Sequence, residues 1–268
     1  MGGALKPKQI KRVAEAEAEA KKIEAEADLE IEAMQLKAGA ERAIKRFVVE
    51  EIKKQENIER IGGQAALYVE DDANPEDVEE DWIFNFLDKC RLTSDADMQE
   101  LWARILAGEA NQPGSCSKRS VNLVASMNRR DARTFTNLCR FTVRLKEGIA
   151  GRTLYRNRSP SFSDNAVPVI FDTDDDIYFE GGVTSGNLLH LNDIGLIQLE
   201  RIAEVGRKSV SLSGKVEYFD TRIHLKLPPS SEKTLPIGLA DFTQAGSELF
   251  KVCAPEPKEG FIEYLREK

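Results

Sequence analysis

Alternating apolar and acidic positions mark the first quarter of the chain. From Ile23 to Ala33 an apolar residue stands at every second position and an acid fills each position between them. A period of two is typical of a half-buried strand. However, the segment from Pro7 to Ile61 is rich in Ala, Glu, Lys, Leu and Met, which favour helix over strand, and these preferences add up over a long window. We therefore predict one long helix over residues 7–61, about 80 Å long at a rise of ~1.5 Å per residue.

The surface of this helix is expected to lack a strong apolar seam, because the alternation spreads the Ala side chains around it. Its charges are banded. Residues 14–33 hold eight acids and two bases, with basic residues on either side. Basic, acidic and basic blocks in this order suit a staggered partner helix. Two interpretations stay open: a solvated single helix, or a helix that self-associates or docks a partner protein.

A clear amphipathic pattern follows between residues 74 and 148. Large apolar residues recur at spacings of three and four, which predicts helices with one buried face. Asn74 before Pro75 is a typical helix start, Ser94 with Asp97 is expected to cap a second helix, and Gly108 is expected to end it. Four residues are predicted to anchor the core: Trp82, Phe86, Trp102 and Leu106.

Basic residues concentrate on the next two predicted helices, which Met127, Asn128 and Arg129 join in the manner of a helix-turn-helix. Such a cluster can contact nucleic-acid phosphates. It can equally form solvated helix faces or pair with the acidic block of the long helix. The candidate nucleic-acid-binding residues are Lys118, Arg119, Arg129, Arg130 and Arg133.

The pattern changes again after Gly148. Residues 151–166 are polar and rich in turn formers, and we expect a loop. The runs VPVIF (167–171) and DIYFE (176–180) look like short strands, and a helix capped by Thr184 or Ser185 should end at Gly195. A hairpin is predicted around Phe219-Asp220-Thr221 and a further helix after Thr243. The order of elements over about 184–253 is similar to that of winged-helix modules.

Taken together, these patterns predict a mainly α fold with a smaller α+β part. Residues 1–73 should form a long N-terminal helix or coiled-coil-like arm, and residues 74–148 a helical domain. Residues 149–268 should form a winged-helix-like α+β domain.

Composition narrows the classes of function. The net charge of −8 argues against a general nucleic-acid binder. The four cysteines form no C-x-x-C pair, so they are expected to be reduced thiols in a cytoplasmic protein. No signal peptide or apolar run of membrane-spanning length occurs, so we expect no membrane partner.

Sequence motifs for known chemistry are sparse. The sequence contains no phosphate-binding loop, no G-x-G-x-x-G and no G-x-S-x-G, and its two histidines, His190 and His224, are expected to be surface or packing residues. Asp172, Asp174 and Asp176 are a weak candidate for a metal site, but Ile177 and Val183 stand where a calcium loop needs Gly and Glu. An acidic turn is the simpler interpretation, and no cofactor is expected.

Several segments carry a family resemblance: KPKQIKRVAEAEAEA, EEIKKQENIERI, DANPEDVEEDWIFNFLDKCR, SDADMQELWARILAGEANQPGSCSKRS and DARTFTNLCRF. Together they cover about residues 6–141 and are similar to a bacterial family catalogued as domain of unknown function 2806. Members more distantly resemble abortive-infection proteins of the alpha type, which implies a phage-defence context. The resemblance implies no activity for any residue. Because the chain starts almost on the first segment, we expect it to lack an upstream helix.

The sequence therefore favours a non-enzymatic cytoplasmic interaction or regulatory protein. It would assemble through residues 7–61, as a homo-oligomer or with a partner protein, in an anti-phage context. Two alternatives stay open. One is a DNA-binding regulator that uses the basic helices at 117–144, and the other is a metal-dependent hydrolase that uses the acids at 172–176.

Overall fold

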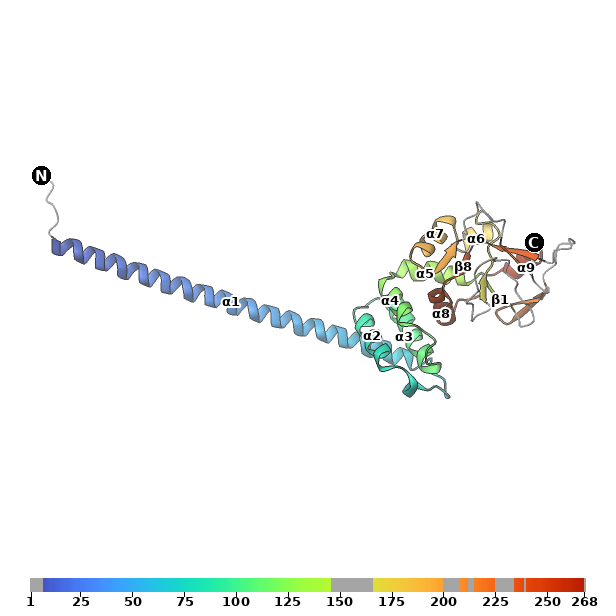
Figure 1. Ribbon diagram of the computed structural model, residues 1–268, viewed down its shortest axis with the longest axis horizontal. Coiled ribbons are helices and arrows are strands. Elements are labelled where there is room, and N and C mark those ends of the chain that lie inside the picture. Colours follow the sequence, from blue (N-terminus) through green and yellow to red (C-terminus); the bar gives the residue numbers. More distant parts are fainter. Residues whose placement is uncertain are drawn as a thin grey trace, which may run out of the picture. The chain divides into compact units, whose positions relative to one another are not determined.

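The computed structural model describes residues 7–145, 166–199, 208–211, 215–224, 234–238 and 240–267 (Figure 1). The fold is mainly helical with a small antiparallel sheet part. The chain divides into two compact units, Met1–Glu56 and Asn57–Lys268. Each unit is described by itself below.

Helix α1 spans Pro7–Ala65 and confirms the predicted long helix (Figure 1). Helix-forming composition therefore prevails over the alternating pattern. Two adjacent glycines, Gly62 and Gly63, would be expected from the sequence to break or bend the helix, but α1 continues through both. Ile61 and Ala65 are buried in the core of the second unit, so packing holds the last turn in place despite the low helix propensity of glycine.

The middle of the chain is helical, as predicted. Ser117 and Asn128 cap α4 and α5, and Asn128 forms a capping box with Asp131. The cap of α3 is Asp95 instead of Ser94, because the Asp95 carboxylate accepts a hydrogen bond from the Met98 amide at 3.1 Å. The helices are η1 (Pro75–Asp77), α2 (Glu80–Cys90), α3 (Ala96–Asn111), α4 (Lys118–Ser126) and α5 (Arg129–Cys139).

Gly108 lies inside α3, although the sequence suggested that it ends the helix. A side chain at this position would meet Val252 Cγ1, in helix α8, at 2.9 Å. The glycine therefore permits close packing between two helices and does not terminate one.

Short strands and helices make up the rest of the second unit. The strands are β1 (Thr142–Leu145), β2 (Ala166–Pro168), β3 (Ile197–Leu199), β4 (Lys208–Ser211), β5 (Lys215–Tyr218), β6 (Thr221–His224), β7 (Thr234–Gly238) and β8 (Ala240–Phe242). The helices are α6 (Asp176–Glu180), α7 (Ser185–Asp193), α8 (Gln244–Val252) and α9 (Phe261–Glu267).

All described strand pairs are antiparallel. Strands β2, β1, β5 and β6 form one sheet in that order, β3 pairs with β8, and β4 pairs with β7. The predicted hairpin is confirmed, since Tyr218 faces Thr221 across the β5–β6 turn. The strand predicted at 167–171 is shorter than expected and ends at Pro168. The loop predicted at 151–166 lies outside the described residues except for Ala166.

The run at 176–180 is helix α6, so its prediction as a strand is wrong. Tyr178 explains the difference, because its ring is fully buried and its hydroxyl donates to the Val169 carbonyl at 2.9 Å. A helical turn after Asp175 brings this one side chain inward. Tertiary contacts therefore decide the conformation of a segment too short to decide it by its own pattern.

The core of the helical part is built around aromatic rings. Trp82 stacks on Phe86 with ring centroids 5.2 Å apart, and Trp102 meets Phe86 edge-on at 5.3 Å. The three rings are almost completely buried, and Leu106 packs against the core that they form. The indole N–H of Trp82 donates to the Cys116 carbonyl at 2.6 Å, so the polar edge of the ring is satisfied.

Helix α8 contacts both the middle helices and the strands. It packs against α3 and α4, and at its first turn the backbone comes very close to the segment leading into β3. A Cβ atom at Gly246 would stand 2.0 Å from the backbone oxygen of Leu196. No larger residue fits there unless one of the two segments moves.

We therefore expect Gly246→Ala to lower the free energy of unfolding by about 1–3 kcal/mol, because the added methyl group overpacks a backbone contact. Chemical denaturation of the full chain measures the change. The control is Gly186→Ala in α7, where the nearest atom to the new methyl group would be 4.0 Å away. This control should leave stability unchanged or raise it by up to about 1 kcal/mol through helix propensity. Equal effects of the two substitutions would contradict the close contact.

Candidate functional site

Helix α1 exposes an unusual number of large apolar side chains. Among the side chains that the structure describes in the first unit, ten are between 48 % and 69 % exposed. Soluble proteins commonly expose single apolar residues, but a helix that exposes so many is a typical interaction surface. They are Ile23, Leu29, Ile31, Met34, Leu36, Ile44, Phe47, Val48, Val49 and Ile52.

Charged side chains of α1 pair along the helix. Lys22 lies 4.0 Å from Glu26, and Arg46 lies 3.6 Å from Glu50. Both pairs span one helical turn and are well exposed, so each contributes little to stability. These charges therefore remain accessible to a partner helix.

The predicted basic residues of α4 and α5 are partly neutralised. Arg129 donates to Asp97 at 2.6 Å and lies 3.9 Å from Asp95, and Arg133 donates to Asp97 at 3.2 Å. Lys118 lies 3.7 Å from Asp81. Three of the five candidates thus face carboxylates. The other two, Arg119 and Arg130, are exposed, as Arg129 and Arg133 also are.

A groove of about 440 Å³ lies beside this arginine cluster. Arg129 and Arg133 line it, together with Arg104, which donates to Glu100 at 2.8 Å. Each arginine in the groove faces an acid, so its lining carries nearly balanced charge. Balanced charge weakens the attraction for a polyanion. The ion pairs of Arg129 and Arg133 with Asp97 instead hold α5 against α3.

The acids at 172–176 do not converge. Asp172, Asp174 and Asp176 are exposed, and the Asp172 side chain accepts from the Asp174 amide at 3.0 Å, which closes a local turn. Asp175, which the sequence analysis did not single out, accepts a hydrogen bond from the Tyr264 hydroxyl and so links the turn to α9. Within the described residues, no group of three or more His, Cys, Asp or Glu side chains could hold a metal ion.

Sequence patterns missed three carboxylates that the fold buries fully or in part: Glu109, Asp131 and Glu248. The Glu109 carboxylate accepts from the amides of Gly114 and Cys116, at 2.7 and 2.8 Å. Asp131 caps α5 with one oxygen, and its other oxygen lies 2.7 Å from His190 Nε2. No pattern of periodicity marks such residues, since their role depends on loops and helices distant in sequence.

Glu248 is the most connected of these acids. One carboxylate oxygen accepts from the Ser117 amide, the Ser117 hydroxyl and the Ser120 hydroxyl, at 2.8, 2.9 and 2.6 Å. Burial alone would raise the pKa of Glu248, but these hydrogen bonds and one from Gln244 outweigh it and lower the pKa below its usual value. The side chain therefore ties α8 to the start of α4 as a carboxylate.

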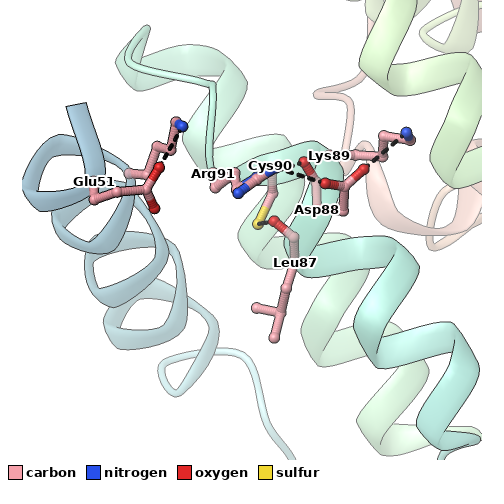
Figure 2. A network of polar contacts seen from close by, with 7 residues as sticks. Glu51, Leu87, Asp88, Lys89, Cys90 and Arg91 are labelled. Atoms are coloured by element: carbon pink, nitrogen blue, oxygen red, sulfur yellow. Dashed lines mark hydrogen bonds and ion pairs between the residues drawn. The ribbon is translucent and has the colours of Figure 1, made fainter. Parts of the chain in front are cut away.

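Figure 2 shows a second polar network, around Asp88, at the end of α2. Asp88 lies 3.0 Å from Lys89 and 2.8 Å from Arg91, and the hydrogen bond and charge of Lys89 lower the pKa of Asp88 most. The neighbouring Cys90 thiol lies 3.8 Å from the Leu87 carbonyl, and burial raises its pKa to about 12. A protonated, buried thiol is not a nucleophile, so Cys90 is a packing residue and not a catalytic one. The ion pairs of Asp88 with Lys89 and Arg91 lie at the surface beside it.

The four cysteines are all free thiols. Burial also raises the pKa of Cys116 to about 12, and the nearby carboxylates of Glu248 and Glu109 add to the effect. Among the described helices, none combines the length and the apolar character that a membrane crossing requires.

Comparison with known proteins identifies one family. The model of a family described as "Protein of unknown function (DUF2806)" matches residues 41–266. The match covers more than half of the chain and confirms the resemblance to this family, although the first of the resembling segments, residues 6–20, lies outside it. No curated protein and no solved structure matches the chain.

The Glu248 network leads to a pH-dependent prediction. We expect Glu248→Gln to lower the free energy of unfolding at pH 7 by about 1.5–3 kcal/mol, because hydrogen bonds to a charged acceptor are removed. A lowered pKa means that the stabilisation is complete above the unfolded-state value, about 4.3, and disappears as the pH falls through the lower folded-state value.

Denaturation curves of the full chain from pH 7 to pH 3 test this prediction. The difference between the natural chain and Glu248→Gln should shrink below about pH 4.3. Glu263→Gln is the matched control, since Glu263 is exposed on α9. A difference that stays constant across this pH range would contradict the role given to the carboxylate.

Proposed function

The chain belongs to the family described as "Protein of unknown function (DUF2806)", and we propose that it is a non-enzymatic interaction or regulatory protein. In this proposal, two copies of the chain pair through helix α1. The exposure of ten large apolar side chains on α1 carries this proposal. Burial of such side chains between two helices releases about 25 cal/mol for each Å² of apolar surface. A partner helix therefore supplies the burial that α1 does not obtain within its own unit.

Charge indicates the direction of pairing. Residues 14–33 hold eight acids and two bases, whereas residues 37–54 hold six bases and three acids. A parallel pair in register would set each acidic block against the acidic block of its partner. An antiparallel pair centred near residue 35 sets acids against bases at both ends, which is why we favour this arrangement.

The biological context is a further part of the proposal. We propose that the assembly acts in bacterial abortive infection, that is, in defence against phages. The support for this context is the more distant resemblance of members of this family to abortive-infection proteins of the alpha type. The pairing of α1 is independent of this context.

Exchange of charge between the blocks tests the pairing. One variant carries Glu26→Lys, Glu30→Lys and Glu32→Lys, and a second carries Arg42→Glu, Lys45→Glu and Arg46→Glu. In an antiparallel dimer the first variant leaves residues 14–33 with five acids and five bases, so this block no longer attracts the basic block of its partner. The second variant sets acids against acids at both ends, and we expect both dimers to dissociate. An equimolar mixture removes the repulsion at one end and sets bases against acids at the other, so it should form a heterodimer. Sedimentation velocity measures the species.

The control is a pair of apolar substitutions, Leu36→Gln and Phe47→Gln, which should weaken the dimer without rescue by either charge variant. Circular dichroism reports whether α1 stays helical in each variant. A natural chain that sediments as a monomer at micromolar concentration would refute self-assembly. A first variant that dimerises as tightly as the natural chain would refute the antiparallel direction, because loss of the acidic block weakens only that arrangement.

DNA binding by the basic helices is a second candidate function. The exposure of Arg119 and Arg130 favours it. The order of elements also favours it, because α7, β3, the β5–β6 hairpin and α8 follow one another as in a winged-helix module, and we propose that they form a winged-helix-like part. The support is weaker than for assembly, because Arg129 and Arg133 are paired with Asp97.

A salt titration tests this candidate. If the basic helices bind phosphates, the affinity for a duplex oligonucleotide should fall steeply as salt rises. Arg119→Glu with Arg130→Glu should abolish binding, and removal of either arginine alone should reduce the logarithmic salt slope by about 1. Fluorescence anisotropy measures both quantities. Lack of binding at low salt would eliminate this function.

A further inference from the structure

A pocket of about 310 Å³ lies between strand β1, the β5–β6 turn and the end of helix α8. It is lined by the aromatic residues Phe219 and Phe250, the basic residues Arg144 and Lys251, the acidic residue Asp220, and by Thr142 and Ala254. All of them belong to the second unit, so the pocket does not depend on the pairing of α1.

Thr142 lines this pocket and carries an unsatisfied polar atom. The residue is only 4 % exposed, and its Oγ1 is a buried atom without a hydrogen-bond partner. Buried hydroxyl groups are nearly always bonded, so each exception calls for an explanation. A ligand group that accepts a hydrogen bond at this position would satisfy the hydroxyl.

The backbone at two other lining residues is strained. Phe219 has φ 50° and Ala254 has φ 41°, and they are the two residues other than glycine with positive φ in the part of the chain that the structure describes. Each conformation has a local cause. A two-residue hairpin turn requires positive φ, and the position after a helix commonly adopts it.

The residue types at these positions are nevertheless unusual. Glycine or asparagine normally occupies both kinds of site, because a larger side chain costs energy there. Strain of this kind clusters at binding sites, where the side chain itself is needed. The Phe219 ring is 37 % exposed and meets Tyr218 edge-on at 4.8 Å, so it forms part of the pocket wall.

The charged groups indicate what the pocket would bind. Thr142 and Arg144 are two positions apart on β1, so their side chains share one face of the strand. The Arg144 guanidinium lies 6.0 Å from the centroid of the Phe250 ring. A guanidinium fork matches a carboxylate or phosphate, and the faces of aromatic rings accept flat apolar groups.

We propose that this pocket binds a small organic anion built on a flat ring. The carboxylate or phosphate of the ligand accepts hydrogen bonds from Arg144 and from the Thr142 hydroxyl, and the ring packs between Phe219 and Phe250. The volume is at the lower end of the range for small-molecule sites. A metabolite-sized ligand therefore fits, and a macromolecule does not.

Calorimetric titration of the full chain with four probes tests the proposal. Benzoate and adenosine monophosphate combine a ring with an anionic group, whereas inorganic phosphate and benzyl alcohol each offer one of these features. We expect saturable binding of at least one ring-bearing anion, and binding of both single-feature probes weaker by about tenfold or more.

Substitutions then locate the site. Arg144→Gln and Thr142→Val should each weaken binding of the ring-bearing anion by about fivefold or more, whereas Arg130→Gln, on α5, should leave it unchanged. Phe219→Gly should weaken binding and raise the melting temperature, because glycine adopts positive φ without strain. A purely structural Phe219 would change the melting temperature and leave the affinity intact.

Three outcomes would overturn the proposal. The first is that neither benzoate nor adenosine monophosphate binds up to about 10 mM, a very weak affinity for a built pocket. The second is that phosphate or benzyl alcohol binds as tightly as the ring-bearing anions. The third is that binding survives Arg144→Gln and Phe219→Gly unchanged.

Discussion

The close packing of helix α8 is the constraint on which the second unit depends. At Gly246 there is no room for a side chain beside the Leu196 carbonyl. At the other end of α8, Val252 packs against Gly108 of α3, where an added side chain would also clash. Glu248 on the same helix binds the first turn of α4 through two serines. Backbone contact and a satisfied carboxylate thus join the middle helices to the strands in one core.

Helix α1 obeys a different constraint. Its last turns are held by burial of Ile61 and Ala65, but the described residues before Asn57 have no such core in their own unit. Helix propensity keeps this segment regular, while its apolar side chains remain exposed. Exposure of this kind is the physical reason for the proposal that two copies of the chain associate through α1. Arg129 and Arg133 are paired with Asp97, so these two arginines contribute to the packing of α5 against α3.

The pocket beside β1 combines local backbone strain with a proposed binding site. The β5–β6 turn and the end of α8 both require positive φ, and the chain satisfies the requirement with Phe219 and Ala254 instead of glycine. Thr142, whose buried hydroxyl has no partner, lines the same pocket. The sequence predicted the turn at Phe219-Asp220-Thr221, but it did not indicate that Phe219 would be strained or would line a pocket with Thr142 and Phe250.

Local chemistry in the sequence determined the long helix, the hairpin turn, the helix after Thr243 and the family, because each depends on residues that are neighbours along the chain. Other features were decided only by tertiary structure. Gly62-Gly63 stay helical because Ile61 and Ala65 are buried, residues 176–180 become a helix because Tyr178 enters the core, and Arg129 is paired because Asp97 on another helix lies against it. Contacts between residues distant in sequence leave no periodic pattern, and for this reason only the folded chain shows them.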